Sequence, residues 1–529
     1  GIGWPMLVSF FCRFGMASED SAFVGHLSTK AMSALGDSMR SQLFGQAAAA
    51  LIAYMFLGEV SRSNSTSGSG YGPKQFLAAA GLSDMVTNIL IIPPLAFNMS
   101  LNALVSQAMG SGNKKMAGTW LQMSVLWLTA SYLPVLVSFF FVSPMLRVLG
   151  FDSDICELAG TYARFNVFWP IPNGWYQCMR FYFQAQGITR PAMYNNIAFL
   201  VVNALLNWIF VFGGPFRSLG WNGLGFVGAA ISLSCSRSLQ PLFYWLYMFA
   251  WKKAHLDTWP SLCEKTFLDR EHVRSFLAMA LPQIGTLVFQ AVVGQATTLL
   301  IAKLGEAAIS ASAASSAATM VLTGGLSPTL SMVGGIRVGY HLGNNQPTRA
   351  SKVAYLSMLL GAFLTSVLGV MTVIFGSPII SVVTDDPAVQ EPAVSILPAV
   401  MLNLVASIMV SIGTQGVLTS QGRTKAVTFL SMGFELPLSV GSTALLVFVF
   451  KASLLQVYWA QAAVSLLEAA VIFVIIGRSN WEGLATAAQV RQGVEETSEE
   501  TNHRESVISM QARGGEKAAS EQDEASRGE

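Results

Sequence analysis

The chain has 529 residues, of which 52% are hydrophobic and only 11% are charged. An ordinary soluble domain carries about 25% charged residues. The deficit is greater in the main part of the chain, because 11 of the 29 acidic residues lie from Arg478 onward. This composition excludes a disordered protein, a nucleic-acid-binding protein and an ordinary cytosolic enzyme. It predicts an all-α protein that crosses a membrane many times.

Twelve apolar segments have the roughly 20 residues that a membrane-spanning helix needs. They are centred on residues 2–27, 76–106, 118–146, 155–183, 191–213, 223–250, 275–302, 307–334, 352–382, 391–417, 426–450 and 453–477. Proline interrupts several of them, as at Pro93, Pro170, Pro282 and Pro437. Such breaks survive in lipid only where neighbouring helices or cavity water bond the freed backbone groups.

Basic residues are distributed unevenly over the connecting loops. If the amino terminus is cytoplasmic, the inner loops contain Lys114, Lys115, Arg190, Lys252, Lys253, Lys265, Arg270, Arg274, Arg349, Lys352, Arg423 and Lys425. The outer loops contain few bases and four acids, Asp152, Asp154, Asp385 and Asp386. Because basic loops stay on the cytoplasmic side, we expect both termini in the cytoplasm, in the plasma membrane or an organelle membrane.

Two loop motifs recur in the two halves of the chain. The segment from Gly110 to Ala117 matches the segment from Gly343 to Ala350 at an offset of 233, and Gln186-Gly187 matches Gln421-Gly422 at an offset of 235. This predicts two six-helix lobes of the same orientation, related by an axis along the membrane normal. The expected N-lobe is residues 1–250, the C-lobe is residues 275–477, and residues 251–274 form a cytoplasmic connection.

Two segments lie outside this repeat. Residues 29–72 have no counterpart in the second half, and their apolar run is too short to span comfortably. We expect an interfacial or outer-loop insert there, with an artefact of the gene model as the alternative. Residues 478–529 are polar and acidic, which predicts a disordered cytoplasmic tail.

Short motifs on these spans resemble those of the multidrug and toxic compound extrusion (MATE) family of secondary antiporters. They are Phe23-Val-Gly-His-Leu27, Gln107-Ala-Met-Gly110, Gln186-Gly187 with Arg190-Pro191, and Arg337-Val-Gly339. The resemblance covers roughly residues 1–485 apart from the insert. It implies two lobes around a central cleft that opens alternately to each side. It also implies export of organic solutes in exchange for H⁺ or Na⁺.

Polar side chains in the first lobe resemble the cation site of that family. Asp20 matches an aspartate that binds H⁺ or Na⁺ in many prokaryotic members, and Asn203 and Asn207 match an asparagine pair beside it. The two asparagines are four residues apart and therefore share a helix face. Their carbonyl oxygens suit Na⁺, and a buried aspartate suits proton exchange. The alternative is a polar cluster that only packs the helices.

The second lobe departs from the family pattern. Gln290 and Gln295 stand where relatives carry glutamates, and an amide can bond a substrate but cannot release a proton. Glu435, before Pro437, is then the one acid expected deep in this lobe. We expect Asp20 to carry the coupling, with Glu435 as its rival.

Aromatic residues in the fourth span, among them Trp169, Trp175 and Tyr176, complete the predicted substrate cavity with Gln290 and Gln295. Aromatic faces suit flat or cationic organic molecules, although packing and lipid contact are the alternative roles. We expect a monomer in a lipid bilayer that binds small organic solutes. No nucleic acid, metal or cofactor is expected beyond the coupling ion, with Na⁺ possible at Asp20, Asn203 and Asn207.

Three other functions remain to be weighed. A lipid-linked oligosaccharide flippase of the same superfamily would need an arginine-lined cavity, whereas the bases lie mainly in the inner loops. An intramembrane enzyme would need a nucleophile or metal cluster, and the five histidines are scattered over the loops. An uncoupled family member stays open, because Gln290 and Gln295 cannot carry protons.

Overall fold

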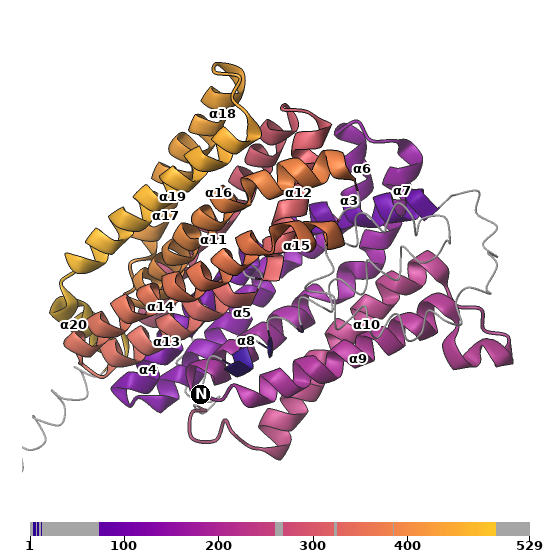
Figure 1. Cartoon of the computed structure of the whole chain (residues 1–529). Coiled ribbons are helices and arrows are strands. Elements are labelled where there is room, and N and C mark those ends of the chain that lie inside the picture. Colours follow the sequence, from indigo (N-terminus) through magenta and orange to yellow (C-terminus); the bar gives the residue numbers. More distant parts are fainter. Residues whose placement is uncertain are drawn as a thin grey trace, which may run out of the picture.

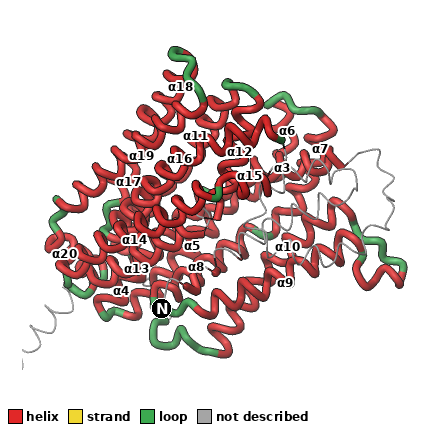
Figure 2. Tube along the Cα trace, in the orientation of Figure 1, coloured by secondary structure: helices red, strands yellow, loops and turns green. Residues whose placement is uncertain are grey.

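The computed structural model describes residues 4–6, 8–9, 12, 73–259, 268–321, 325–383 and 386–493. These residues form helices joined by short loops, and none of them belongs to a strand (Figure 2). The second to twelfth predicted spans lie almost wholly in this part of the chain. Asp20 and the predicted insert at residues 29–72 lie outside it, so those two predictions remain predictions.

The first half contains the α-helices α3 (Pro73–Ile91), α4 (Ala96–Ser111), α5 (Lys114–Phe139), α6 (Val142–Val148), α7 (Ser153–Phe165), α8 (Pro170–Ala185), α9 (Arg190–Phe212) and α10 (Gly225–Trp245). The second half contains α11 (Arg270–Ala302), α12 (Glu306–Val321), α13 (Ser327–Gly343), α14 (Pro347–Ile374), α15 (Gly376–Val383), α16 (Pro387–Ser411), α17 (Thr424–Phe434), α18 (Gly441–Phe448), α19 (Leu454–Gly477) and α20 (Trp481–Arg491). Short 3-10 and π-helical turns join them, namely η1 (Pro93–Leu95), η2 (Asn166–Phe168), η3 (Gly214–Leu219), η4 (Leu246–Trp251), η8 (Ile412–Leu418) and η9 (Glu435–Val440).

The order of elements repeats between the halves, as the loop motifs predicted. α5 begins at Lys114 and α14 at Pro347, and each is followed by a short helix, α6 or α15. α9 begins at Arg190 and α17 at Thr424, which is nearly the same offset. In Figure 1 the two halves lie on opposite sides, with α9 and α10 at one edge and α17 to α19 at the other. α4 and α13 pack against each other between them (Figure 1).

Seven described helices are long and apolar enough to cross a membrane, or eight if the bent pair at Pro93 counts as one span. That pair bends by 42°, where Pro93 and Pro94 begin η1. Many large apolar side chains point outward from the bundle, for example Leu356, Phe363 and Val370 of α14. A surface of this kind is stable in lipid and not in water. The chain is therefore an integral, multi-pass membrane protein.

A proline also determines how α11 packs against α17. Pro282 lies inside α11 and has no N–H to donate to the carbonyl group of Ala278. The hydroxyl group of Thr424 donates to that carbonyl oxygen at 3.4 Å, and the hydroxyl group of Thr428 donates to the carbonyl oxygen of Pro282 at 2.8 Å. The neighbouring helix thus bonds the backbone that the proline leaves open, and these bonds set the register between α11 and α17.

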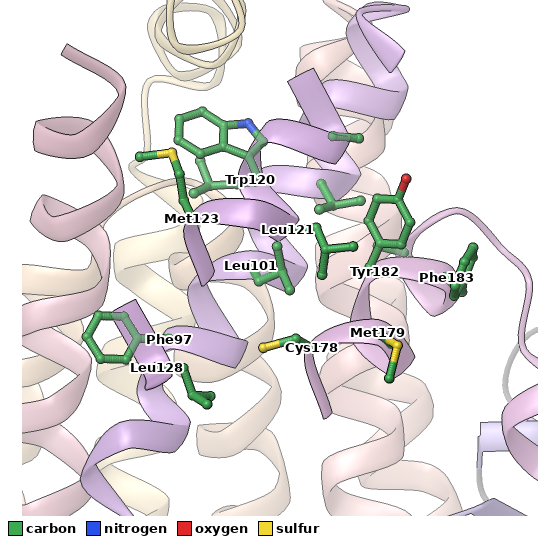
Figure 3. Packing of buried hydrophobic residues seen from close by; sticks show 14 of the residues in the cluster. Phe97, Leu101, Trp120, Leu121, Met123, Leu128, Cys178, Met179, Tyr182 and Phe183 are labelled. Carbon is green, nitrogen blue, oxygen red and sulfur yellow. The ribbon is translucent and has the colours of Figure 1, made fainter. Parts of the chain in front are cut away.

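The largest buried apolar cluster joins α4, α5 and α8. Figure 3 shows Leu101, Trp120 and Leu121 in this cluster, with Tyr182 and Phe183 on the neighbouring helix. Phe276 of α11 belongs to the same cluster and stacks on Trp120, with ring centroids 6.3 Å apart. Because α11 belongs to the second half, one apolar core connects the two lobes near the ends of these helices.

That end of the bundle carries basic residues, and we call it the basic end. It contains the starts of α5, α9, α14 and α17, with Lys114, Arg190, Arg349 and Lys425 close to them. The caps of α7 and α16 at the opposite end are acidic, Asp152 and Asp386. Basic residues thus gather mainly at one end, which is the bias on which the topology prediction rests, whereas Arg147, Arg217, Lys303 and Lys451 lie toward the other end.

The prediction of a disordered tail from Arg478 onward is wrong up to Gly493. Residues Trp481–Arg491 form helix α20, which lies at the basic end beside α13 and α14 (Figure 1). Ala485 and Ala488 are fully buried in its contact with the bundle. The buried side chains of this helix are small, so its sequence shows only a weakly apolar face. In the fold these side chains pack closely against the bundle. Residues 494–529 lie outside the described part of the chain.

Candidate functional site

The asparagine pair of the first lobe lies on helix α9. Asn203 and Asn207 are both fully buried, and the side-chain amide of Asn207 donates to the backbone carbonyl oxygen of Asn203 at 3.1 Å. The structure therefore places both amides inside the lobe on one helix face, as their spacing predicted. Asp20 is outside the described residues, so the three-residue cation site remains a prediction.

A third asparagine on the same helix organises the lobe interior. Asn196 accepts hydrogen bonds at its side-chain oxygen from the hydroxyl group of Tyr176, at 2.5 Å, and from the amide of Gln240, at 2.8 Å. Tyr176 is fully buried and packs edge-on against Tyr244. Tyr176 therefore lies in the packed core between α8, α9 and α10, which differs from the cavity position predicted for it.

The two tryptophans of the predicted cavity have different surroundings. Trp175 is 42% exposed, and its indole N–H donates to the hydroxyl oxygen of Thr129 at 2.9 Å. Trp169 is half-buried and packs against the large apolar cluster. Only Trp175 presents much of its ring to the outside of the packed protein.

Two buried arginines of the first lobe were missed by the sequence reasoning, which placed the bases mainly in loops. Arg180 of α8 and Arg237 of α10 are both buried. Arg180 donates from Nη2 to the side-chain oxygen of Gln177 at 2.7 Å, and its guanidinium lies 4.6 Å from the ring centre of Phe181. Their place within apolar spans was the signal that could have found them.

The structure brings together two predicted residues of the second lobe. Gln290 of α11 donates from Nε2 to Oε1 of Glu435, the first residue of the π-helical turn η9, at 3.1 Å. This contact lies farther along the α11–α17 seam, beyond the bonds that Thr424 and Thr428 make. The amide of span seven thus bonds an acid supplied by span eleven. Gln295 does not join this pair, and its side chain is exposed.

Glu468 is a second acid in this lobe, so the expectation that Glu435 is the one deep acid is wrong. Glu468 lies near the middle of α19, which packs against η9, and its side chain is only 6% exposed. The packing of α19 against η9 places Glu468 on a helix that neighbours Glu435. One oxygen of each, Oε1 of Glu468 and Oε2 of Glu435, is buried without a hydrogen-bond partner among the described residues. The sequence signal that could have identified Glu468 is its position as a single acid within the apolar run of span twelve.

A π-helical turn carries one member of this carboxyl pair. η9 contains Pro437 and interrupts the span between α17 and α18. Single π-helical turns inside longer helices occur frequently at functional sites, because they redirect side chains and free backbone groups. The carboxyl pair therefore combines one half-buried and one buried acid with an irregular helix at mid-span.

The lobes meet most closely where α4 and α13 end, at the basic end. A Cβ atom on Gly343 would lie 2.0 Å from the backbone oxygen of Gln107, and one on Gly110 would lie 2.0 Å from that of Tyr340. Only glycine permits such an approach of two backbones. The side-chain amide of Gln107 also donates to the backbone oxygen of Ser420 at 2.7 Å. The basic end is therefore closed in this structure.

Helix α20 spans this closed junction. Its Arg491 donates from Nη1 to the side-chain oxygen of Gln107 in the first lobe at 2.9 Å. The same guanidinium donates from Nη2 to the backbone oxygen of Gln421 in the second lobe at 3.2 Å. The adjoining Gln492 accepts from Asn113, at 2.8 Å, and from the indole of Trp120, at 3.0 Å. If the lobes separate here, α20 must lose its bonds to one of them.

Comparison with known proteins agrees with this architecture. The MatE family profile matches residues 47–209 and 282–440, together more than half of the chain. The chain belongs to the MATE family. As a member of this family of multidrug efflux transporters, it is a transporter and not an enzyme. The first match begins inside the predicted insert, which the structure does not describe.

Individual relatives of this MATE transporter are distant. It is 26% identical to multidrug and toxin extrusion protein 2 of Mus musculus, over 78% of this chain and 70% of that protein. It is 23% identical to multidrug and toxin extrusion protein 1 of Xenopus tropicalis, over 74% of this chain and 66% of that protein. The crystal structure of the eukaryotic MATE transporter AtDTX14 superposes with a TM-score of 0.67 at 18% identity, covering 92% of this chain and 98% of that one. This last likeness shows a shared fold.

Proposed function

We propose that this MATE transporter exports organic solutes, cationic or xenobiotic ones, in exchange for H⁺ or Na⁺ by alternating access. The observation that supports coupling is the pair of acids formed by the half-buried Glu435 and the buried Glu468. Two neighbouring negative charges are costly in an apolar interior, so such a pair holds a proton or a cation. Gain and loss of that ion would favour different arrangements of the lobes, which is the requirement for coupling.

The candidate site residues of both lobes have roles in this proposal. Glu435 and Glu468 bind the ion, and Gln290 orients Glu435 through its hydrogen bond. Asp20 with Asn203 and Asn207 forms a second ion site in the first lobe. Gln295, Trp169 and Trp175 contact the solute.

The arrangement of charge supports a topology for this transport cycle. The basic end faces the cytoplasm, and both termini lie on that side, in the plasma membrane or an organelle membrane. The protein works as a monomer, because each chain supplies two lobes and the junction between them. Closure of the basic end then corresponds to a transporter closed toward the cytoplasm.

Transport of the dye ethidium into proteoliposomes, with H⁺ and Na⁺ gradients imposed separately, tests this function. We expect the wild-type chain to concentrate the dye with one of the two gradients. The double variant Glu435→Gln, Glu468→Gln should bind the dye but no longer concentrate it. The matched control Glu482→Gln removes an exposed acid of α20 and should transport normally. Concentration of dye by the double variant at the wild-type level would contradict the proposal.

A lipid-linked oligosaccharide flippase is the second candidate, and the buried Arg180 and Arg237 are the observation that favours it. Cationic side chains inside a lobe suit a pyrophosphate-bearing substrate. Translocation of a fluorescent lipid pyrophosphate across vesicles, without any ion gradient, distinguishes this function from dye antiport. Translocation of the lipid without gradient-driven dye transport would favour the flippase. Gradient-driven dye transport without translocation of the lipid would favour the antiporter.

A further inference from the structure

A cavity of about 520 Å³ opens at the basic end, between the start of α11, the start of α17 and the end of α20. Three cationic side chains line it, Arg423, Lys425 and Arg491, and no acidic residue belongs to its lining. The cavity lies where two membrane-spanning helices begin, which is the depth of lipid headgroups. Its position and charge are thus those of an anion site at the membrane surface.

The guanidinium of Arg491 is the most enclosed of the three cations. Its two acceptors, the side-chain oxygen of Gln107 and the backbone oxygen of Gln421, are both neutral. Removal from water lowers the pKa of Arg491 to about 10, and no acid opposes this effect. The side chain nevertheless remains charged at neutral pH. A partly dehydrated cation without a counter-charge among the described residues is costly, and an anion would offset that cost.

Gly422 leaves room for this guanidinium. Its backbone has φ of +80°, and a Cβ atom there would lie 2.6 Å from Nη2 of Arg491. The Gln-Gly motif before span eleven therefore has a packing function, because it lets the guanidinium lie against the loop. Arg423 also bonds a neutral acceptor, the hydroxyl group of Ser479, at 3.0 Å. Neither arginine is neutralised by the protein groups that it contacts.

The start of α17 adds backbone donors to the same cavity. Thr424, Lys425 and Ala426 are its first three residues, and all three line the cavity. The residue before them, Arg423, makes no side-chain capping bond to the helix. The first N–H groups of a helix have no acceptor within it and favour anions. Cations and backbone donors thus converge on one space.

We propose that this cavity binds a phosphate monoester group, supplied by an anionic membrane lipid or by free phosphate. Arg423, Lys425 and Arg491 contact the phosphate, and the start of α17 supplies N–H donors. Basic pockets between membrane helices on the cytoplasmic side bind phosphorylated lipid headgroups in this way. Because Arg491 also bonds Gln107 of the other lobe, an occupied site would stabilise the closed basic end.

Thermal unfolding of the purified full chain in a neutral detergent tests the site. Dioctanoyl phosphatidic acid, dioctanoyl phosphatidylcholine and inorganic phosphate are titrated separately, because a ligand of the folded state raises Tm with its concentration. We expect a saturable rise in Tm with phosphatidic acid and none with phosphatidylcholine. Removal of one positive charge in Lys425→Gln should weaken the apparent affinity about fivefold, and Arg491→Gln about tenfold or more.

The control is the double variant Lys114→Gln, Lys115→Gln, which removes two exposed positive charges at the same end but outside the cavity. It should bind phosphatidic acid with wild-type affinity. Lys425 is exposed, so its variant reports on binding even if Arg491→Gln does not fold. An equal response to inorganic phosphate, lost in Lys425→Gln, would support the site and identify free phosphate as the source. Absence of a saturable shift, or equal weakening in the control, would overturn the proposal.

Discussion

The interiors of the two lobes differ although their helices repeat. The first lobe buries amides and guanidinium groups, Asn196, Asn203, Arg180 and Arg237 among them, whereas the second contains two acids, the half-buried Glu435 and the buried Glu468. When the starts of the repeated helices are aligned, Glu435 corresponds to Val201 and Glu468 to Leu239. The duplicated scaffold therefore preserves helix packing and not the position of charge. Different chemistry in each lobe is possible because packing depends on shape, whereas ion binding depends on a few side chains.

The largest effect is expected from a variant that tests which of the two lobes carries the coupling ion. Asp20→Asn removes the acid predicted for the first lobe while it preserves shape and hydrogen bonding. We expect gradient-driven export of ethidium to stop and dye binding to persist. Glu435→Gln must be measured beside it in the same proteoliposomes. Near wild-type concentrative transport by Asp20→Asn, with loss in Glu435→Gln, would show that the second lobe drives the cycle alone.

The junction between the lobes depends on the absence of a side chain at Gly343. In Gly343→Ala the new methyl group would meet the backbone oxygen of Gln107, so the closed basic end must shift. Overpacking of this kind costs about 1–3 kcal/mol, and we expect a lower Tm together with slower transport. Gly81→Ala is the matched control, because a Cβ atom at Gly81 has open space around it. Equal Tm values for the two variants would argue against a closely packed junction.

The amide network of the first lobe predicts a smaller loss of stability. Asn196→Ala leaves the hydroxyl group of Tyr176 and the amide of Gln240 buried without their acceptor, which should cost about 2 kcal/mol or more. Tyr176→Phe removes only one donor, and Asn196 keeps its bond from Gln240. This variant should cost about 1 kcal/mol. Thermal unfolding of both variants measures the difference, and a greater loss in Tyr176→Phe would refute the network.

The bond between Gln290 and Glu435 predicts a weak effect of one conservative change. Gln290→Glu should be tolerated, because Glu435 and the new acid can share a proton. Gln290→Leu should be worse, since Glu435 then loses its amide donor. The ethidium transport rates of both variants give the comparison. Failure of Gln290→Glu with normal transport by Gln290→Leu would contradict this role for the amide.

The smallest effect is expected from the insert of the first half. The second half completes the corresponding connection without such a segment, and insertions in surface loops change the closure entropy only slightly. Deletion of residues 29–72 should therefore leave a membrane-inserted protein that transports ethidium. Loss of insertion or of all transport would show that the segment belongs to the lobe itself.

Much of the fold follows from local features of the sequence. The length of each apolar run predicts a membrane-spanning helix, and the recurring Gln-Gly loops predict two related lobes. The buried positions of Asn203 and Asn207 follow from their spacing on an apolar helix. These features are readable because they depend on residues close together in the chain and on the thickness of a bilayer.

The candidate sites depend on contacts between distant segments. Gln290 meets Glu435 because the hydroxyl groups of Thr424 and Thr428 bond the backbone near Pro282 and so align α11 with α17. Arg491 reaches both lobes because α20 packs small side chains against the bundle and Gly422 leaves space for the guanidinium. The sequence by itself determined which segments are membrane-spanning helices, whereas helix α20 and the burial of Glu468 became visible only in the fold. The tertiary structure decided which polar residues meet, because the register between helices depends on side-chain packing across more than a hundred residues of chain.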